Sequence, residues 1–473
     1  MSLRAKVLRG GVYLVLRQGL GVIVSAVGVI VLTRIIGPEA YGLYAAAFGI
    51  YIYLFIVFQW GVNTYLIRRE EEPLPQDYNQ AFSLLLLLSL AGTGAAILLA
   101  LPLLERWVNL EGFGPVATAM FAVLPVQLLG LVPMARLERA LDYRRIALIE
   151  LTGLIIFYLV ALPLAYQGLG YWAPIVGKWV EQLLISSLLY WMSSYRPQLY
   201  WENARVRSMV GYGLGYSSSI WIWQLRSLVN PLVVGRYLGA EMVGYVALAI
   251  RLVEQLSFAK LVAYRLSIAA LARLQGDRAR MVKAVTEAMG LQVMALGPFL
   301  AGFGMLAPWI IPLLFGYSWL SVLEVYPFIA LSYLSNAVFA LHSSTLYVLG
   351  RNWRVAIFHL VHMVLFGGSA LLLVPRLGLE GYGWAEVVAL PSYILVHWFI
   401  VYVGKPGYVR AGIWFTASTI PLFSWQLGAW TIISIFIPLL WPATRRDLLE
   451  IIRVVLQRRT YGHHSSDSEL QQR

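Results

Sequence analysis

Apolar runs of about 20 residues recur along nearly the whole chain and are separated by short polar turns. A helix of this length is what crosses the ~30 Å hydrocarbon core of a bilayer. Because lipid offers no hydrogen bonds to the backbone, such runs must be helical. We therefore expect an all-α polytopic membrane protein. The clearest windows lie near residues 11–33, 42–66, 81–104, 115–135, 146–166, 171–192, 211–235, 242–264, 288–313, 322–349, 355–375 and 381–403.

The composition excludes other classes of protein. Hydrophobic residues make up 60% of the chain and charged residues 12%, and the mean hydropathy is +0.71, which leaves too little polar surface for a soluble globule. The absence of cysteine excludes a disulfide framework, thiol catalysis and cysteine metal sites. The net charge of +13 is dispersed through loops, so we expect the lipid bilayer and no nucleic acid as a partner.

The distribution of cations predicts the orientation of the chain in the membrane. Most of the 36 Lys and Arg residues lie in both tails and in one alternate set of loops. The positive-inside rule then places both termini in the cytoplasm and the protein in the cytoplasmic (inner) membrane. Few cations occupy the opposite loops, namely Arg34, Arg106, Arg236 and Arg376.

The same rule decides how residues 411–441 cross the membrane. Basic residues flank this apolar segment on both sides, at Lys405 and Arg410 and again at Arg445 and Arg446. A cytoplasmic start and finish requires a hairpin that turns near Pro421–Gln426, or a re-entrant loop. We expect a hairpin of two short spans, which gives about fourteen transmembrane helices, followed by an amphipathic helix and a disordered cytoplasmic tail.

A polar turn between the first two windows recurs 202 residues later at identical spacing. Glycines allow a sharp turn, Pro38 is expected to end the first helix, and Glu39 begins the second near its positive dipole end. Such duplication predicts two homologous six-helix lobes of like orientation. The repeated residues are Arg34, Gly37, Glu39 and Gly42, and then Arg236, Gly239, Glu241 and Gly244. The expected domains are 1–200, 201–403, 404–443 for the hairpin and 444–473 for the tail.

The residues Thr33-Arg-Ile-Ile-Gly37-Pro38-Glu39-Ala-Tyr41-Gly42-Leu43 resemble the first-loop signature of the Wzx-like polysaccharide flippases. These belong to the multidrug/oligosaccharidyl-lipid/polysaccharide (MOP) exporter superfamily. The resemblance implies a transporter, and no enzyme, that flips polyprenyl-diphosphate-linked oligosaccharide by alternating access during surface polysaccharide biosynthesis. It also implies glycan polymerases or glycosyltransferases as candidate partners.

Charged residues inside the predicted spans are the candidate site residues. Each costs at least ~2.5 kcal/mol at the bilayer centre unless it faces water or a partner. The cations outnumber the well-embedded carboxylates, which suits an anionic ligand in a cationic cavity between the lobes. Arg226 is the foremost candidate because its own helix offers no carboxylate three or four residues away. The candidate ligand-binding cations are Arg226, Arg251, Lys178 and Arg17, while Lys260 lies close enough to a cytoplasmic end to snorkel. Mutual neutralisation is the alternative role for the i,i+3 pairs Lys178 with Glu181 and Arg251 with Glu254, and snorkelling is the alternative for Arg17.

The sequence predicts no cofactor beyond an ion gradient. A sodium or proton gradient is the candidate energy source, and Glu181, Glu254 and Glu386 are the candidate coupling carboxylates. Gly177-Lys178 lacks the remaining glycine and hydroxyl of a phosphate-binding loop, and the six histidines form no metal-binding pattern.

Three other classes of protein compete with this hypothesis. Another member of the MOP superfamily, a murein-precursor flippase or a drug exporter, is the alternative that shares the fold. The former typically carries several charges in its first span, whereas Arg17 stands alone here, and the latter binds cations through acidic cavities. A glycan polymerase or ligase needs a large outer loop, whereas the predicted outer loops here are short. A major-facilitator permease usually has a Gly/Asp/Arg-rich loop between spans two and three, where this chain has Arg68-Arg69-Glu70-Glu71-Glu72.

Overall fold

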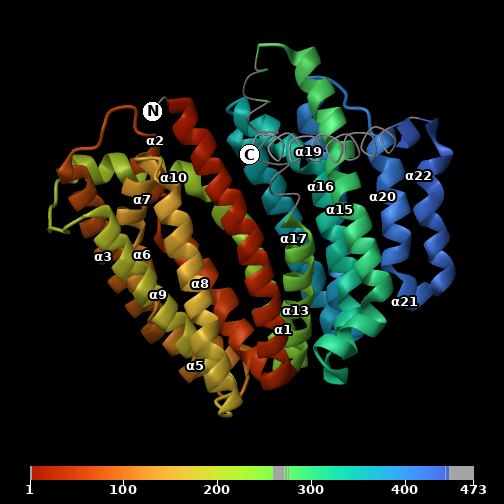
Figure 1. Cartoon of the computed structure of the whole chain (residues 1–473), viewed down its shortest axis with the longest axis horizontal. Helices are drawn as coiled ribbons and strands as arrows, with labels where there is room; N and C mark the ends of the chain where they lie inside the picture. Colours follow the sequence, from red (N-terminus) through yellow and green to blue (C-terminus); the bar gives the residue numbers. More distant parts are fainter. Residues whose placement is uncertain (1–2, 259–270, 272–273, 275, 443, 447–473) are drawn as a thin grey trace, which may run out of the picture. The chain divides into compact units, whose positions relative to one another are not determined.

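The computed structural model describes residues 3–258, 271, 274, 276–442 and 444–446, and all regular elements in this part of the chain are helices (Figure 1). Two compact units emerge. The first draws on residues 1–258, 309–329 and 350–396, and the second on 259–308, 330–349 and 397–473. The predicted division into lobes at residue 200 remains a prediction.

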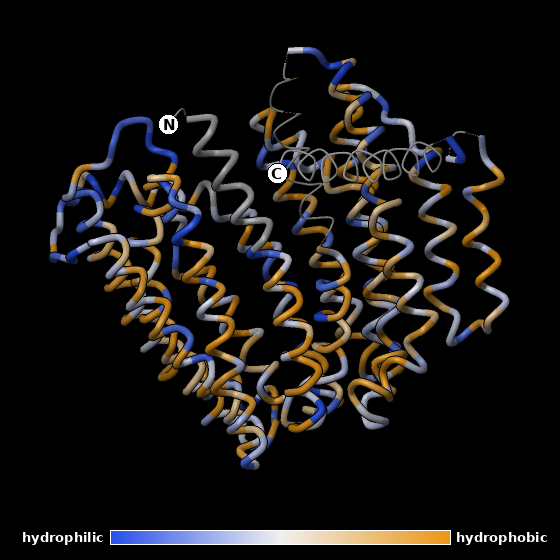
Figure 2. Tube along the Cα trace, viewed as in Figure 1, coloured by the Kyte–Doolittle hydropathy of each residue, from blue (hydrophilic) through white to orange (hydrophobic). Residues whose placement is uncertain are grey.

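Among the residues that the structure describes, eight helical segments are long and apolar enough to cross a membrane. Hydrophobic residues dominate their middles, while hydrophilic residues gather in the connections (Figure 2). The segments are Arg17–Phe58, Pro75–Val108, Phe113–Arg139, Tyr143–Tyr166, Arg278–Leu314, Val322–Val348, Asn352–Leu377 and Leu379–Ile400. The chain is therefore a multi-span, all-helical membrane protein, and the arrangement of fourteen crossings remains a prediction.

The long helix α1 (Leu3–Phe58) contains the first two predicted spans. It is interrupted at Gly37, whose φ of 77° and ψ of 172° are not helical. The expectation that Pro38 ends the first helix is wrong in detail, because Gly37 makes the break and Pro38 follows it. A proline in the first turn of the next segment costs no hydrogen bond, since that N–H would have no helical partner.

The second copy of the turn repeats this geometry between α12 (Gly235–Leu238) and α13 (Ala240–Leu256), where Gly239 has φ 92° and ψ 178°. The two copies also pack against each other reciprocally. A Cβ added to Gly42 would lie 1.7 Å from the Ala240 carbonyl oxygen, and one added to Gly244 would lie 2.3 Å from the Pro38 carbonyl oxygen. Because Ala240 is the counterpart of Pro38, the repeats cross with a local two-fold relationship.

Each of the two repeated arginines contacts the end of a helix from the other half of the sequence. Arg34 Nη1 donates to the Leu313 carbonyl, 2.7 Å away, at the end of α15 (Arg278–Leu314). Arg236 lies over the Trp107 ring, 5.6 Å from its centroid, at the end of α4 (Leu101–Val108). A cation beside the last carbonyls of a helix is favoured by the helix dipole. Each turn is thus fixed to an apolar helix of the other half of the sequence.

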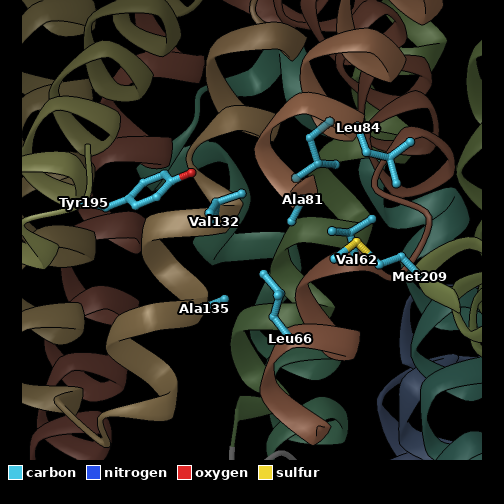
Figure 3. Close-up of a cluster of buried hydrophobic side chains, with 9 residues drawn as sticks. Val62, Leu66, Ala81, Leu84, Val132, Ala135, Tyr195 and Met209 are labelled. Carbon is cyan, nitrogen blue, oxygen red and sulfur yellow. The ribbon is translucent and has the colours of Figure 1, made fainter. Parts of the chain in front are cut away.

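The connection between the halves binds to the polar face of α3 (Pro75–Ala95). Alternate backbone N–H groups of this connection donate to buried side chains of α3, so the segment is held although it lacks regular structure. The pairs are Gln198 N with Asn79 Oδ1 (3.3 Å), Tyr200 N with Ser83 Oγ (2.9 Å) and Glu202 N with Gln80 Oε1 (2.6 Å). Beneath it, a hydrophobic cluster joins α2 (Val62–Arg68), α3, α7 (Leu131–Arg139) and Met209 of α10 (Asn203–Gln224) (Figure 3).

The remaining helices of the first unit complete the packing around α1, which contacts both α8 (Tyr143–Tyr166) and α13. They are η1 (Ala96–Ala100), α5 (Phe113–Phe121), α6 (Leu124–Leu129), α9 (Trp172–Ser193), α11 (Arg226–Val229), η2 (Asn230–Val234), η3 (Tyr317–Trp319), α17 (Asn352–Leu377), α18 (Leu379–Ala389) and η4 (Leu390–Ser392), with the starts of α16 (Val322–Val348) and α19 (Tyr393–Ile400).

In the second unit, the chain reverses direction within the predicted C-terminal hairpin. After α20 (Val409–Leu422) and α21 (Ser424–Leu427) come η5 (Ala429–Phe436) and α22 (Ile437–Leu440), which pack back on α20. Ser434 Oγ donates to the Ala417 carbonyl, 3.3 Å away. Whether these segments cross the bilayer remains a prediction, and the tail beyond residue 446 lies outside the described residues.

Candidate functional site

Each of the four predicted binding cations contacts a carboxylate. Arg17 Nε lies 2.9 Å from Glu150, and Lys178 Nζ lies 3.0 Å from Glu181. The other two pairs are Arg226 with Glu386 and Arg251 with Glu254. The fifth cation, Lys260, lies outside the described residues. The candidate coupling carboxylates Glu181, Glu254 and Glu386 are therefore the partners of candidate binding cations.

Arg226 lies where the seventh predicted span is interrupted, at the junction of α10 and α11. Its guanidinium pairs with Glu386 of α18, a carboxylate with no exposed surface, and lies 5.3 Å from the Phe366 ring centroid and 5.9 Å from that of Trp223. Sequence reasoning missed this partner because it comes from a helix 160 residues away. The pair is electrically compensated, so Arg226 is less available to a ligand than its sequence context indicates.

A second buried group adjoins this pair. The His362 side chain is 1% exposed, and its Nδ1 lies 2.9 Å from Ser392 Oγ. Its ring also lies 5.6 Å from the Trp223 ring. The Nε2 atom of His362 and the Oε2 atom of Glu386 have no hydrogen-bond partner. These contacts make the Arg226 region a closely packed polar cluster inside the helical core.

Arg251 of α13 is held more loosely. Its Nη1 lies 3.8 Å from Glu254 Oε2, and the two side chains are 41% and 47% exposed. Its Nη2 donates to Ser25 Oγ of α1, 2.6 Å away, and Gln255 Nε2 lies 3.4 Å from the same oxygen. Tyr158 OH of α8 donates to the Ser25 carbonyl, 3.3 Å away. Among the described candidate cations, Arg251 combines the longest ion-pair distance with the greatest exposure.

Sequence reasoning missed the polar residues around Arg251. Ser25 and Tyr158 carry no charge and lie in apolar runs, so hydropathy gives no signal for them. Tyr41 and Tyr44 belong to the first polar turn, on α1, and α1 packs against α13, which carries Arg251. The signal that could have found Tyr41 and Tyr44 is their position within that motif.

A separate ionic cluster fixes the start of α10 to α3. The buried Asp77 carboxylate accepts from Arg205 and lies 2.8 Å from Arg69 Nη1. Hydrogen bonds from Arg205 and Tyr200 lower the pKa of Glu202 below its ordinary value of 4.5. The hydrogen bonds to Glu202 and Asp77 raise the pKa of Arg205. The two arginines and the two carboxylates of this cluster compensate one another's charge and join the start of α10 to α3.

The comparisons with known proteins agree on one family. The family described as "Polysaccharide biosynthesis protein" matches residues 31–324. The succinoglycan biosynthesis transport protein ExoT of Rhizobium meliloti (strain 1021) is 26% identical over 310 residues, which cover 64% of this chain and 61% of ExoT. The amylovoran biosynthesis protein AmsL of Erwinia amylovora is 27% identical over 183 residues, covering 38% and 47%. The matches thus span less than two thirds of either relative.

Solved structures share the fold over most of the chain. The lipid II flippase MurJ in an inward closed conformation has a TM-score of 0.71 at 14% identity, covering 95% of this chain and 99% of MurJ. An inward-facing multidrug resistance MATE family transporter of the MOP superfamily has a TM-score of 0.63 at 17% identity, covering 81% and 95%. At such identities the likeness establishes the fold, which is that of MOP transporters.

Proposed function

This chain belongs to the polysaccharide biosynthesis protein family, and from that premise we propose that it flips a polyprenyl-diphosphate-linked oligosaccharide from the inner to the outer leaflet of the cytoplasmic membrane. The transport names of its relatives and its MOP fold support translocation without bond chemistry. The cargo is a phosphorylated sugar lipid destined for a surface polysaccharide.

The observation that carries the proposal is the exposure of Arg251 and Glu254 within an apolar helix. Arg251 lies eleven residues after the start of α13, which corresponds to about 16 Å of helix and hence to the middle of a ~30 Å hydrocarbon core. We infer that these side chains, which are 41% and 47% exposed, face water rather than lipid, because a charge in contact with acyl chains is costly. A hydrated, charge-bearing surface at mid-membrane is what a polar headgroup needs in order to cross.

The headgroup chemistry follows from electrostatics. A diphosphate loses its hydration on leaving water, and guanidinium groups replace that hydration with charge-assisted hydrogen bonds. The lipid tail stays in the bilayer while the glycan moves through the hydrated region. Rocking of the lobes 1–200 and 201–403 then exposes the site to each side of the membrane in turn.

An ion gradient supplies the directionality in this proposal. Among the three candidate coupling carboxylates, Glu254 is the most exposed, and it lies next to the binding cation Arg251. Binding of sodium or a proton at Glu254 would release Arg251 for the diphosphate, which couples the two events. Glu386 is the weakest of the three candidates because Arg226 already neutralises it.

The test is glycan export in a strain that lacks the native gene, complemented with Arg251→Ala or with both Arg226→Ala and Arg251→Ala. We expect at least a tenfold loss of export for Arg251→Ala and a complete loss for the double variant. The control is Arg376→Ala, which removes an exposed cation at the end of α17. Full export by the double variant, present at normal levels in the membrane, would overturn the proposal.

A further inference from the structure

Two histidines of the second unit share one phenol hydroxyl. His342 Nε2 of α16 and His397 Nδ1 of α19 each lie 2.6 Å from the hydroxyl oxygen of Tyr408, the residue before α20. A phenol has one hydrogen to donate, so one imidazole accepts it while the other donates an N–H to the same oxygen. The three side chains therefore form one continuous hydrogen-bonded triad, which we call the histidine–tyrosine triad.

Packing of the connection at residues 401–408 holds the phenol between the two imidazoles. The Gly407 N–H donates to Thr286 Oγ1 of α15, 3.0 Å away. The Phe339 ring of α16 lies 6.0 Å from the Tyr408 ring. A hydroxyl held in this way keeps both hydrogen bonds, and hydrogen bonds in such a series polarise one another.

The two imidazoles of the triad differ in their access to water. His342 has no exposed surface, and its Nδ1 has no hydrogen-bond partner, whereas His397 is partly exposed. His342 lies six residues before the end of α16, and His397 lies three before the end of α19. The connections that follow these helices carry Arg351 and Lys405, so the positive-inside rule predicts that both lie on the cytoplasmic side. The triad thus has a buried end and an accessible end close to the predicted cytoplasmic surface.

Charged side chains surround the triad without pairing with it. On α15, Lys283 and Glu287 are exposed and lie 3.9 Å from each other. Arg410 of α20 lies along α15, where a Cβ added to Gly290 would come within 3.0 Å of its side chain. Lys405 is exposed. In the described part of the chain the phenol is the polar partner of both imidazoles. A proton on the triad is therefore stabilised by hydrogen bonds rather than by a carboxylate.

We propose that His342, Tyr408 and His397 form a proton-binding site that takes up one proton from the cytoplasmic side and shares it between the two imidazoles. With the proton on His397, its Nδ1–H donates to the phenol oxygen, and the phenol O–H donates to His342 Nε2. When each hydrogen moves along its own hydrogen bond, the charge passes to His342 and the phenol stays neutral.

The triad has room for one added proton. A second one would place two N–H donors on the phenol oxygen and leave the phenol hydrogen without an acceptor in the triad. It would also place two cationic rings 6.4 Å apart. This site is separate from Glu254 and does not depend on the cargo proposed above.

The test is ¹⁵N NMR of the histidine ring nitrogens in the purified full-length protein in liposomes, with His342→Gln and His397→Gln used to assign the signals. We expect the two rings to titrate together between about pH 8 and pH 5, with one midpoint and one proton in total. Tyr408→Phe keeps the aromatic ring and removes the hydroxyl. In this variant we expect His342 to stay neutral and His397 to bind the proton about 10-fold more weakly, because a hydrogen bond to the charged form is lost.

The matched control is His359→Gln, which removes a histidine of the first unit and should leave both titration curves unchanged. Three results would each overturn the site: separate midpoints for His342 and His397 in the wild type, wild-type curves in Tyr408→Phe, or two imidazoles that remain neutral throughout. The measurement involves no glycan lipid, so each of these results leaves the flippase proposal standing.

Discussion

At the scale of single residues, the cations inside the predicted spans differ in how tightly their carboxylate partners hold them. Arg226 is paired with a carboxylate that has no exposed surface, whereas Arg251 and Glu254 are 3.8 Å apart and partly exposed. A fully desolvated pair is expensive to separate, while a loose and hydrated pair exchanges partners at low cost. We therefore propose a structural role for Arg226 and a ligand-binding role for Arg251.

The first prediction concerns the buried pair. Removing one partner leaves an uncompensated buried charge, so Arg226→Leu or Glu386→Leu alone should destabilise the protein by roughly 3–5 kcal/mol, while the double variant should recover most of this loss. Thermal unfolding in detergent, arranged as a double-mutant cycle, measures the coupling. Additive losses in the double variant would contradict the assignment.

The second prediction concerns pH. Because hydrogen bonds lower the pKa of Glu202 in the folded state, its contribution to stability is present above 4.5 and is lost as the pH falls through the lowered pKa. We expect the melting temperature to drop between pH 5 and more acidic values by less in Glu202→Gln than in the wild type. The group is exposed, so the difference is small. Parallel pH profiles of the two proteins would refute it.

At the scale of elements, the crossing of the two repeated turns leaves no room for a side chain larger than glycine. Gly42 and Gly244 each lie against a backbone carbonyl of the other copy, and a carbonyl cannot move aside as a flexible side chain can. The turn therefore needs glycine at these positions because of packing between copies, in addition to the backbone conformation that Gly37 and Gly239 require.

The third prediction follows from this contact. Gly42→Ala and Gly244→Ala should each force the repeats apart and lower the melting temperature, with overpacking costs of roughly 1–3 kcal/mol or more. Gly19→Ala is the matched control in the same helix, because no neighbouring atom lies within 4 Å of its added Cβ. It should be neutral or stabilising by up to about 1 kcal/mol, since alanine favours helix more than glycine does. Equal effects at positions 19 and 42 would disprove the crossing.

At the scale of the whole molecule, the distribution of charge predicts the orientation and the number of crossings. Cation-rich connections alternate with cation-poor ones along the chain, and the two repeats share one orientation in this scheme. The C-terminal segments reverse direction between Leu422 and Ala429, as a hairpin requires. Fourteen crossings with both ends in the cytoplasm remain a prediction.

The fourth prediction tests that topology directly. The chain has no cysteine, so single cysteines can be introduced without a background. Gln426→Cys and Gln167→Cys should react in intact cells with a maleimide that does not cross membranes, whereas Glu71→Cys should react only after permeabilisation. All three positions are exposed. If Gln426→Cys is protected in intact cells while Gln167→Cys is labelled, the predicted hairpin is wrong.

The sequence by itself determined the class of protein and its family. Apolar length is a local property, so residues alone indicated a helical membrane protein, and the turn at residues 33–43 indicated the family that the matching region confirms. The repeat likewise predicted equivalent turns, which Gly37 and Gly239 form.

Only the tertiary structure decided which charges are compensated and which are available. Glu386 reaches Arg226 across 160 residues, and Ser25 reaches Arg251 across 226. Spacing along one helix does indicate the pairs Lys178–Glu181 and Arg251–Glu254, but neither it nor hydropathy encodes a contact between distant helices such as Arg226–Glu386. The choice of Arg251 over Arg226 follows from this physical difference.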